Sequence, residues 1–172
     1  MTEPTALPFD PIERAALLWT KSWGDARRMR LATSVMRAQQ ILIARYDEVL
    51  REYGLTFARF EALVLLKFSS TGALPMKIIG DRLQVHATSV TNTVDRLAAA
   101  GLVDRRKNPR DGRGVLAVIT DRGREVVENA AAALTAIDFA LLDLTDDQVD
   151  QVSAVLTDLR AANGDFRGSD SE

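Results

Sequence analysis

The sequence contains no cysteine and only one histidine, His86, among its 172 residues. Disulfide bonds, thiolate catalysis and cysteine-based zinc sites are therefore excluded, and a lone histidine is weak evidence for a metal site. The longest wholly apolar runs, such as residues 62–66, are far too short to cross a bilayer. The N-terminus has no basic segment followed by an apolar one, so we expect a cytoplasmic protein without a membrane partner.

Motifs typical of enzymes are also missing. The sequence has no glycine-rich phosphate loop, no nucleophile elbow and no pair of carboxylates at a plausible site. We therefore predict that the protein is not an enzyme and that it holds no cofactor and no metal.

Positive charge is concentrated in one short segment of a chain that is acidic overall. The net charge is −2 and the pI about 5.5, which taken alone argues against nucleic acid as a partner. Residues 105–113, however, hold five basic residues and a single acid, whereas residues 138–172 hold nine acids and two arginines. A charge run is often only a solvated surface, so its meaning depends on its neighbours. The five basic residues are Arg105, Arg106, Lys107, Arg110 and Arg113.

Hydrophobic periodicity predicts helices on both sides of a mixed central region. Residues 25–53 contain neither proline nor glycine and keep their apolar residues near one stripe, which is typical of a long helix that ends at Gly54. From Val127 to Leu141, apolar residues recur at alternating steps of three and four, which indicates a helix packed against another helix. Thr145 and Gln148 then form a capping box. The expected helices cover residues 10–24, 25–53, 56–68, 75–83, 87–100, 121–141 and 145–163, with a loop at 69–74.

The stretch VHATSVTNTVDRLAAAGLV, residues 85–103, combines poor helix formers with a helical spacing of its apolar residues. Val90, Val94 and Leu97 share one face, so the hydroxyl and amide side chains occupy the other. Such groups can hydrogen-bond base edges and phosphates, and we interpret the stretch as the second helix of a helix-turn-helix. The candidate DNA contacts on this helix are Thr88, Ser89, Thr91, Asn92 and Arg96.

Some of these residues have a structural alternative. Serine and threonine near a helix start often cap the helix, so their hydroxyl groups could have that role instead. His86, a further candidate DNA contact, directly precedes the helix and could lie near a phosphate or simply begin the helix in solvent.

A basic hairpin is predicted after the helix. Residues 102–105 and 115–119 are β-prone, and Asn108 and Pro109 between them are typical turn formers. We therefore expect a hairpin wing over about 103–119 with a long basic tip, and hence a mainly α fold with a small β-hairpin wing. The candidate DNA contacts of the wing are Arg105, Arg106, Lys107, Arg110, Asp111 and Arg113.

The order of these motifs resembles that of a known family. Thr88-Ser89-Val90-Thr91 is followed by Val94-Asp95-Arg96-Leu97 and by Gly101-Leu102-Val103. The wing then carries Asp111-Gly112-Arg113 before its second β-prone run, and Thr120 begins the next helix. Over about residues 28–162 the chain resembles the MarR family of bacterial transcription regulators. His86 and Gly114 depart from the pattern, because the family more often has a hydroxyl cap and a hydroxyl or charged residue at these places.

The resemblance implies a homodimer whose terminal helices interlock and whose two winged helix-turn-helix lobes bind a near-palindromic double-stranded DNA operator. It also implies that Arg113 enters the minor groove while Asp111 orients it, and that the protein is a repressor released by a small aromatic or anionic ligand. The expected division is a disordered N-terminus (1–9), N-terminal dimerisation helices (10–54), a DNA-binding lobe (55–120, with its recognition helix at about 87–100), C-terminal dimerisation helices (121–163) and a flexible acidic tail (164–172).

Five residues are candidates for binding such a ligand, because they combine apolar surface with a cationic anchor. Phenylalanine and methionine at helical spacing are more often plain core, and an arginine on a helix surface can be merely solvated. The candidates are Met36, Arg37, Phe57, Arg59 and Phe60.

A winged-helix protein that binds only other proteins is the alternative function. It would leave the basic wing and the polar helix face unused. Binding to DNA should weaken steeply with salt, whereas binding to an apolar protein partner should not.

Overall fold

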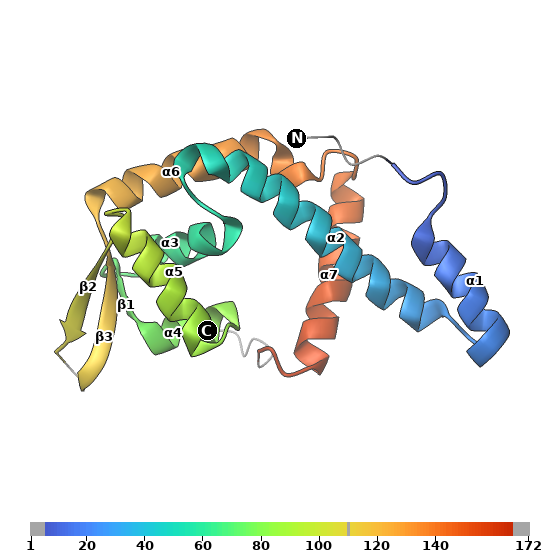
Figure 1. Cartoon of the computed structure of the whole chain (residues 1–172), viewed down its shortest axis with the longest axis horizontal. Coiled ribbons are helices and arrows are strands. Elements are labelled where there is room, and N and C mark those ends of the chain that lie inside the picture. The colour runs from blue at the N-terminus through green and yellow to red at the C-terminus, as the bar shows by residue number, and fades with distance from the viewer. Residues whose placement is uncertain (1–5, 110, 167–172) are drawn as a thin grey trace.

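The computed structural model describes residues 6–109 and 111–166, together with all side chains in these ranges except those of residues 111–113. Figure 1 shows a lobe with the sheet at one end of the molecule, helix α1 at the other end, and the long helix α2 between them. The elements are α1 (Pro11–Trp23), α2 (Arg27–Leu50), η1 (Arg51–Tyr53), α3 (Phe57–Phe68), β1 (Ala73–Pro75), α4 (Met76–Leu83), α5 (Ala87–Ala99), β2 (Val103–Asn108), β3 (Asp111–Ile119), α6 (Asp121–Ala136), η2 (Asp138–Ala140) and α7 (Asp146–Ala162).

Side-chain caps fix the starts of α1, α6 and α7, as a histidine does for α5. The Asp10 carboxylate accepts from the backbone N–H of Ile12 at 2.8 Å at the start of α1. The Thr120 hydroxyl accepts from the N–H of Gly123 at 2.9 Å at the start of α6. Thr145 and Gln148 form the predicted capping box of α7. Each cap satisfies N–H groups that have no partner within the helix.

The sheet has three antiparallel strands in the order β1-β3-β2. β2 and β3 form the wing, with Val103 opposite Ile119 at its base and Lys107 opposite Val115 towards its tip. The prediction of a long basic tip is wrong, because the ladder continues to Asn108 opposite Asp111. Pairing extends this far because a β-strand needs only backbone N–H and C=O groups, which the polar residues of the segment also supply.

The third strand, β1, lies where the sequence predicted a loop at residues 69–74. Ala73, Leu74 and Pro75 pair with the inner part of β3, from Val118 to Leu116. Leu74 points into the core and is buried, which ties the strand to the lobe. A three-residue strand is too short to show an alternating pattern, so its sequence gave no strand signal.

The helix predicted over residues 121–141 is interrupted. α6 ends at Ala136, and Asp138, Phe139 and Ala140 have φ values of +49°, +48° and +57°. The Tyr46 hydroxyl donates a hydrogen bond of 2.9 Å to the Phe139 carbonyl, and the two rings meet edge to face. Left-handed backbone at residues other than glycine costs energy, so this corner depends on contacts such as the one from Tyr46.

The core lies within the lobe and at its junction with α2. Its fully buried members come from the end of α2, from α3 to α5, from strands β2 and β3, and from α6. By contrast, α1, the first half of α2 and α7 bury few side chains, and among the described residues no side chain of α7 is buried. No described helix is both long and apolar enough to cross a membrane. The largest fully buried side chains are Leu50, Leu63, Leu66, Ile79, Leu97, Leu134, Val94 and Val103.

Candidate nucleic-acid interface

Helix α5 divides its residues between the core and solvent as its sequence predicted. Val90, Val94 and Leu97 retain 2%, 0% and 1% of their exposure, so one face is completely covered. The other face leaves the candidate contact residues exposed. They are Thr88, Ser89, Thr91, Asn92 and Arg96. The poor helix formers therefore form a continuous polar surface, and burial of the valines and the leucine holds the helix in place.

The start of α5 is capped by a histidine. His86 Nδ1 accepts from the backbone N–H of Thr88 at 3.3 Å and lies 3.2 Å from the Thr88 hydroxyl. His86 thus takes the place of the hydroxyl cap common in the resembled family. Thr91 donates its hydroxyl to the Ala87 carbonyl at 3.0 Å, one helical turn back. The Thr91 hydroxyl is thus already hydrogen-bonded within the helix, and Asn92 has no such bond among the hydrogen bonds described.

A tight turn places α5 across α4. Gln84 ends α4 with φ +52° and ψ +41°, a left-handed conformation more usual for glycine. Gly80 allows the two helices to approach closely, because a Cβ atom there would lie 3.2 Å from Val90 Cγ2 and 3.3 Å from the Val85 carbonyl oxygen.

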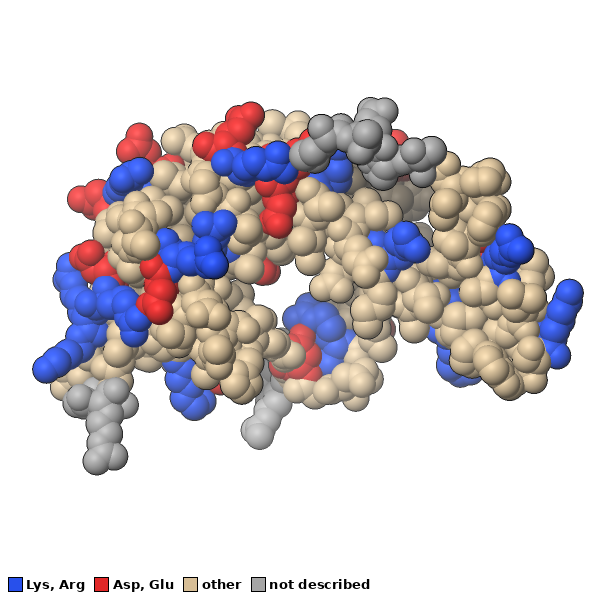
Figure 2. All heavy atoms as spheres, in the orientation of Figure 1, with Lys and Arg blue, Asp and Glu red and all other residues tan. Residues whose placement is uncertain are grey.

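The wing presents basic side chains beside α5. Figure 2 shows Lys and Arg side chains gathered over the wing, with acidic side chains next to some of them. Arg106 pairs with Asp104 at 3.0 Å and Lys107 is exposed. Arg105 instead reaches back to α5 and forms an ion pair with Asp95. Sequence reasoning assigned Arg105 to DNA and gave Asp95 no role; the structure joins the two, and thereby the wing to the recognition helix.

Three wing residues that the sequence selected lie outside the described side chains. Arg110 is outside the described residues altogether, and only the backbone of Asp111 and Arg113 is described, within β3. The described part of the candidate interface therefore consists of α5 and β2. Arg110, Asp111 and Arg113 follow directly after β2 in the sequence.

The five ligand candidates lie in two separate places within one chain. Met36 and Arg37 line a cleft between α1 and α2 of about 310 Å³. Phe57 packs between Tyr46 and Phe60, with its ring centroid 4.9 Å from that of Tyr46 and 6.2 Å from that of Phe60. Met36 and Tyr46 are separated by about 15 Å along α2 at 1.5 Å per residue. The structure of one chain thus does not bring the five into one pocket.

The surroundings of the aromatic candidates are largely packed. Phe60 is buried and Phe57 is half-buried in the core. Burial raises the pKa of Tyr46, whose hydroxyl is bound to the η2 corner. Arg59, the proposed cationic anchor, donates to the Thr56 hydroxyl at 3.2 Å and to the Gly54 carbonyl at 3.0 Å.

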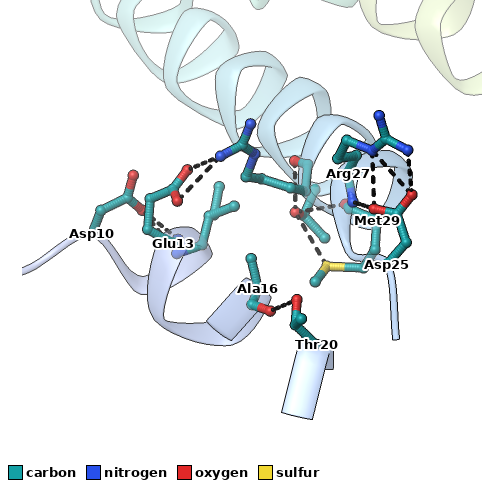
Figure 3. Close-up of polar contacts among 10 residues, drawn as sticks. Asp10, Glu13, Ala16, Thr20, Asp25, Arg27 and Met29 are labelled. Atoms are coloured by element: carbon teal, nitrogen blue, oxygen red, sulfur yellow. Dashed lines mark hydrogen bonds and ion pairs between the residues drawn. The ribbon is translucent and has the colours of Figure 1, made fainter. Parts of the chain in front are cut away.

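An ion pair joins helix α1 to helix α2. Glu13 accepts from Arg30 at 3.1 Å, across the two helices. In the turn between them, Asp25 binds the Arg27 side chain through both carboxylate oxygens, as Figure 3 shows. Trp19 and Trp23 meet edge to face at 4.8 Å, and Trp23 remains 75% exposed.

Comparison with known proteins identifies the family. A model described as the MarR family matches residues 53–114. The crystal structure of Sco5413, a MarR family transcriptional regulator from Streptomyces coelicolor, is 57% identical, with a TM-score of 0.76; the match covers 81% of this chain and 96% of that one. Sco3205 from the same organism, a MarR family regulator solved in complex with DNA, is 26% identical over 81% of this chain and 93% of that chain, with a TM-score of 0.74.

A curated relative agrees. The transcriptional repressor MdtR of Bacillus subtilis is 30% identical over 116 residues, which are 67% of this chain and 74% of that protein. These relatives are transcriptional regulators and not enzymes, in agreement with the lack of enzyme motifs in the sequence. The predicted fold class, mainly α with a winged helix-turn-helix, is confirmed by the matched structures. The chain belongs to the MarR family of transcriptional regulators.

Proposed function

We propose that the protein is a homodimeric repressor that binds a near-palindromic DNA operator through α5 and the wing. The observation that carries the proposal is the exposed polar face of α5 beside the basic strand β2. An α-helix fits the major groove, where amide, hydroxyl and guanidinium groups can read base edges. The related Sco3205 was crystallised with DNA, and MdtR is named a repressor, which supports both parts of the proposal.

The unpartnered apolar surface outside the lobe supports the homodimer. Residues 31–41 of α2 are all exposed, and α7 buries none of its described side chains. Several large apolar side chains exposed along the same helices are typical of a protein interface. A second copy of the chain would cover it, with the two lobes left free to bind half-sites about 34–36 Å apart. The large apolar residues exposed on α1, α2 and α7 are Leu17, Leu18, Trp23, Leu31, Val35, Met36, Ile41, Ile43, Val152, Val155 and Leu159.

The proposal includes release from DNA by a small aromatic or anionic effector. Support comes from two sets of residues, Met36 and Arg37 in the cleft beside α1, and Arg59 beside the aromatic cluster. Benzoate is a simple probe that is both aromatic and anionic. We expect it to raise the melting temperature of the free protein and to weaken operator binding, and Arg37→Ala and Arg59→Ala to identify the anchor.

The first test is selection of bound sites from random duplex DNA, followed by anisotropy titrations of the selected site at several salt concentrations. We expect an inverted repeat and a steep loss of affinity with salt, because bound phosphates release counterions. Without an enriched sequence, and with a flat salt dependence, the protein-binding alternative would be favoured. Sedimentation of the free protein at micromolar concentration should give a dimer, and a monomer would contradict the architecture.

Arg113→Ala tests the wing. We expect the affinity for the selected operator to fall by at least about tenfold. The variant loses a charge-assisted hydrogen bond and the attraction of the guanidinium to the negative potential of the minor groove. Arg28→Ala, which removes an exposed arginine far from the lobe, is the matched control. An affinity within a factor of two of wild type would show that Arg113 does not enter the minor groove.

Asn92→Ala tests the recognition helix. If Asn92 contacts a base edge, the variant should lose about 1 to 3 kcal/mol of binding free energy and relax its preference at one base position. Asn129→Ala, on the exposed surface of α6, provides the control for the same side-chain change. An unchanged base preference in a repeated selection would assign Asn92 to the surface or to positioning.

A further inference from the structure

The far end of α7 is held to the lobe by a small group of side chains. After α7, Gly164 adopts φ +76° and turns the chain back, so that the backbone N–H of Asp165 donates to the Arg160 carbonyl at 3.1 Å. One carboxylate oxygen of Asp165 accepts from Arg160 Nε at 2.5 Å, and the Arg160 guanidinium stacks 5.3 Å from the Phe166 ring centroid. The other oxygen of Asp165 accepts a hydrogen bond from the Gln84 side chain.

Gln84, the partner of Asp165, lies in the turn between the two helices of the helix-turn-helix. Gln84 is the residue with the left-handed backbone that ends α4, and it lies two residues before His86, the cap of α5. Its backbone conformation therefore sets the angle between the two helices of the helix-turn-helix. The Asp165 carboxylate is well shielded, because only 22% of its side chain is exposed. Such shielding strengthens a polar contact relative to a fully solvated one.

The contact crosses an otherwise open space. Glu61, Arg82 and Leu83 on the lobe face Leu159 and Arg160 on α7 across a cleft of about 710 Å³. Figure 2 shows this opening between the lobe and helix α7. Within the described residues, α7 follows the η2 corner at its start, and the Asp165–Gln84 contact links its far end to the lobe.

We propose that Asp165 is a specificity-determining residue that sets the spacing between the two operator half-sites. This inference rests on the proposed function, in which α7 belongs to the dimer interface and α5 reads DNA. The Asp165–Gln84 contact fixes the angle of each lobe relative to its own α7, and hence the distance between the two recognition helices of the dimer. It acts through Gln84 and need not touch DNA.

The geometry makes the spacing sensitive to this contact. α7 has 17 residues and is about 25 Å long, so a rotation of about 10° at its start displaces its far end by about 4 Å. This displacement exceeds one base-pair step of about 3.4 Å. A lobe freed from α7 could therefore reach half-sites one base pair closer together or further apart.

The first experiment measures the lobe relative to α7 within one chain. Because the sequence has no cysteine, Phe68→Cys at the exposed end of α3 and Thr157→Cys on the exposed polar side of α7 give two unique sites for spin labels. Labelled chains are diluted with an excess of unlabelled wild type, so that only distances within a chain are measured by pulsed electron resonance. This readout requires neither DNA nor an operator sequence.

Asp165→Ala is compared with Asp158→Ala, which removes the same charge from an exposed position on α7. We expect the distance distribution to broaden or shift in Asp165→Ala and to stay as in wild type in Asp158→Ala. If the two variants give the same distribution as wild type, the Asp165 contact does not position the lobe and the inference is overturned.

The second experiment measures affinity for the selected inverted repeat and for repeats with one base pair inserted or removed at the centre. We expect Asp165→Ala to bind the best-spaced site a few-fold more weakly and to lose at least about half of the wild-type preference for it, whereas Asp158→Ala keeps both. An unchanged spacing preference in Asp165→Ala overturns the assignment to spacing. If the wild-type protein selects no inverted repeat, the proposed function is refuted instead. The distances within one chain still test the Asp165 contact in that case, because they are measured without DNA.

Discussion

Gly123 lies where α6 packs against the base of the wing, and its replacement by alanine is a direct test of that packing. It is buried in the first turn of α6, where its N–H donates to the Thr120 hydroxyl. A Cβ atom on Gly123 would lie 2.1 Å from the carbonyl oxygen of Leu102 and 2.9 Å from Ile119 Cγ1. The Leu102 carbonyl also accepts from the backbone N–H of Thr120 at 3.1 Å, so it cannot move without weakening that bond.

The expected cost follows from three contributions. Alanine is better than glycine inside a helix by about 1 kcal/mol, which alone would stabilise the variant. Overpacking against a fixed backbone costs about 1 to 3 kcal/mol. Weakening the hydrogen bond to Leu102 costs about another 1 kcal/mol. We therefore expect Gly123→Ala to lower the free energy of unfolding by about 1 to 3 kcal/mol, because the steric contribution exceeds the gain in helix propensity.

Equilibrium urea unfolding at a fixed protein concentration measures this change, and the concentration must be fixed because a dimer is stabilised by mass action. Gly80→Ala is the control, since it is also helical but its nearest neighbours would lie at 3.2 and 3.3 Å and include the movable Val90 side chain. Its change should stay within about 1 kcal/mol, since propensity and crowding offset each other. If Gly123→Ala is as stable as Gly80→Ala, the close approach of α6 to Leu102 is not a constraint on the fold.

Two further predictions concern the lobe. Leu134→Ala should lower the free energy of unfolding by about 2 to 5 kcal/mol, because Leu134 is fully buried, and a smaller loss in urea unfolding would indicate that the core collapses around the cavity. Burial raises the pKa of Glu61, so this carboxyl keeps its proton more readily in the folded state than in the unfolded state. Ionisation of Glu61 therefore lowers the free energy of unfolding once the pH rises above the pKa that the group has in the unfolded chain. Glu61→Gln should therefore be more stable than wild type at pH 7 and nearly equal at pH 4, and the same difference at both pH values would contradict this.

The recognition helix could be predicted because its signal is local. Val90, Val94 and Leu97 follow a helical period within eight residues, and their burial fixes which side chains remain exposed. The turn before it was also visible, since few residues separate the two helices. The burial pattern and the order of the elements along the chain therefore predict which face of α5 is exposed.

Contacts between distant segments could not be predicted in the same way. Arg105 belongs to the basic run, and nothing in that run shows that its guanidinium turns back to Asp95. Gln84 and Asp165 are 81 residues apart, and no pattern in the sequence links the two. The apolar spacing of α6 continues to Ile137, which still packs on the core although the helix ends at Ala136. This is why the sequence predicted a longer helix than the structure has. Sequence periodicity reports which face is buried and not whether the backbone remains helical.

Helix α2 explains why attachments outside the lobe matter for reading DNA. Its last turns belong to the core, where Leu50 is fully buried and Tyr46 binds the η2 corner, whereas residues 31–41 are exposed and available to a second chain. One rigid helix therefore carries both the lobe and the proposed dimer contact. α7 offers a second route, from the η2 corner to Asp165 and the helix-turn-helix. Two attachments constrain an orientation that one flexible attachment would leave free, so a change at either can alter the distance between recognition helices without touching their DNA-facing side chains.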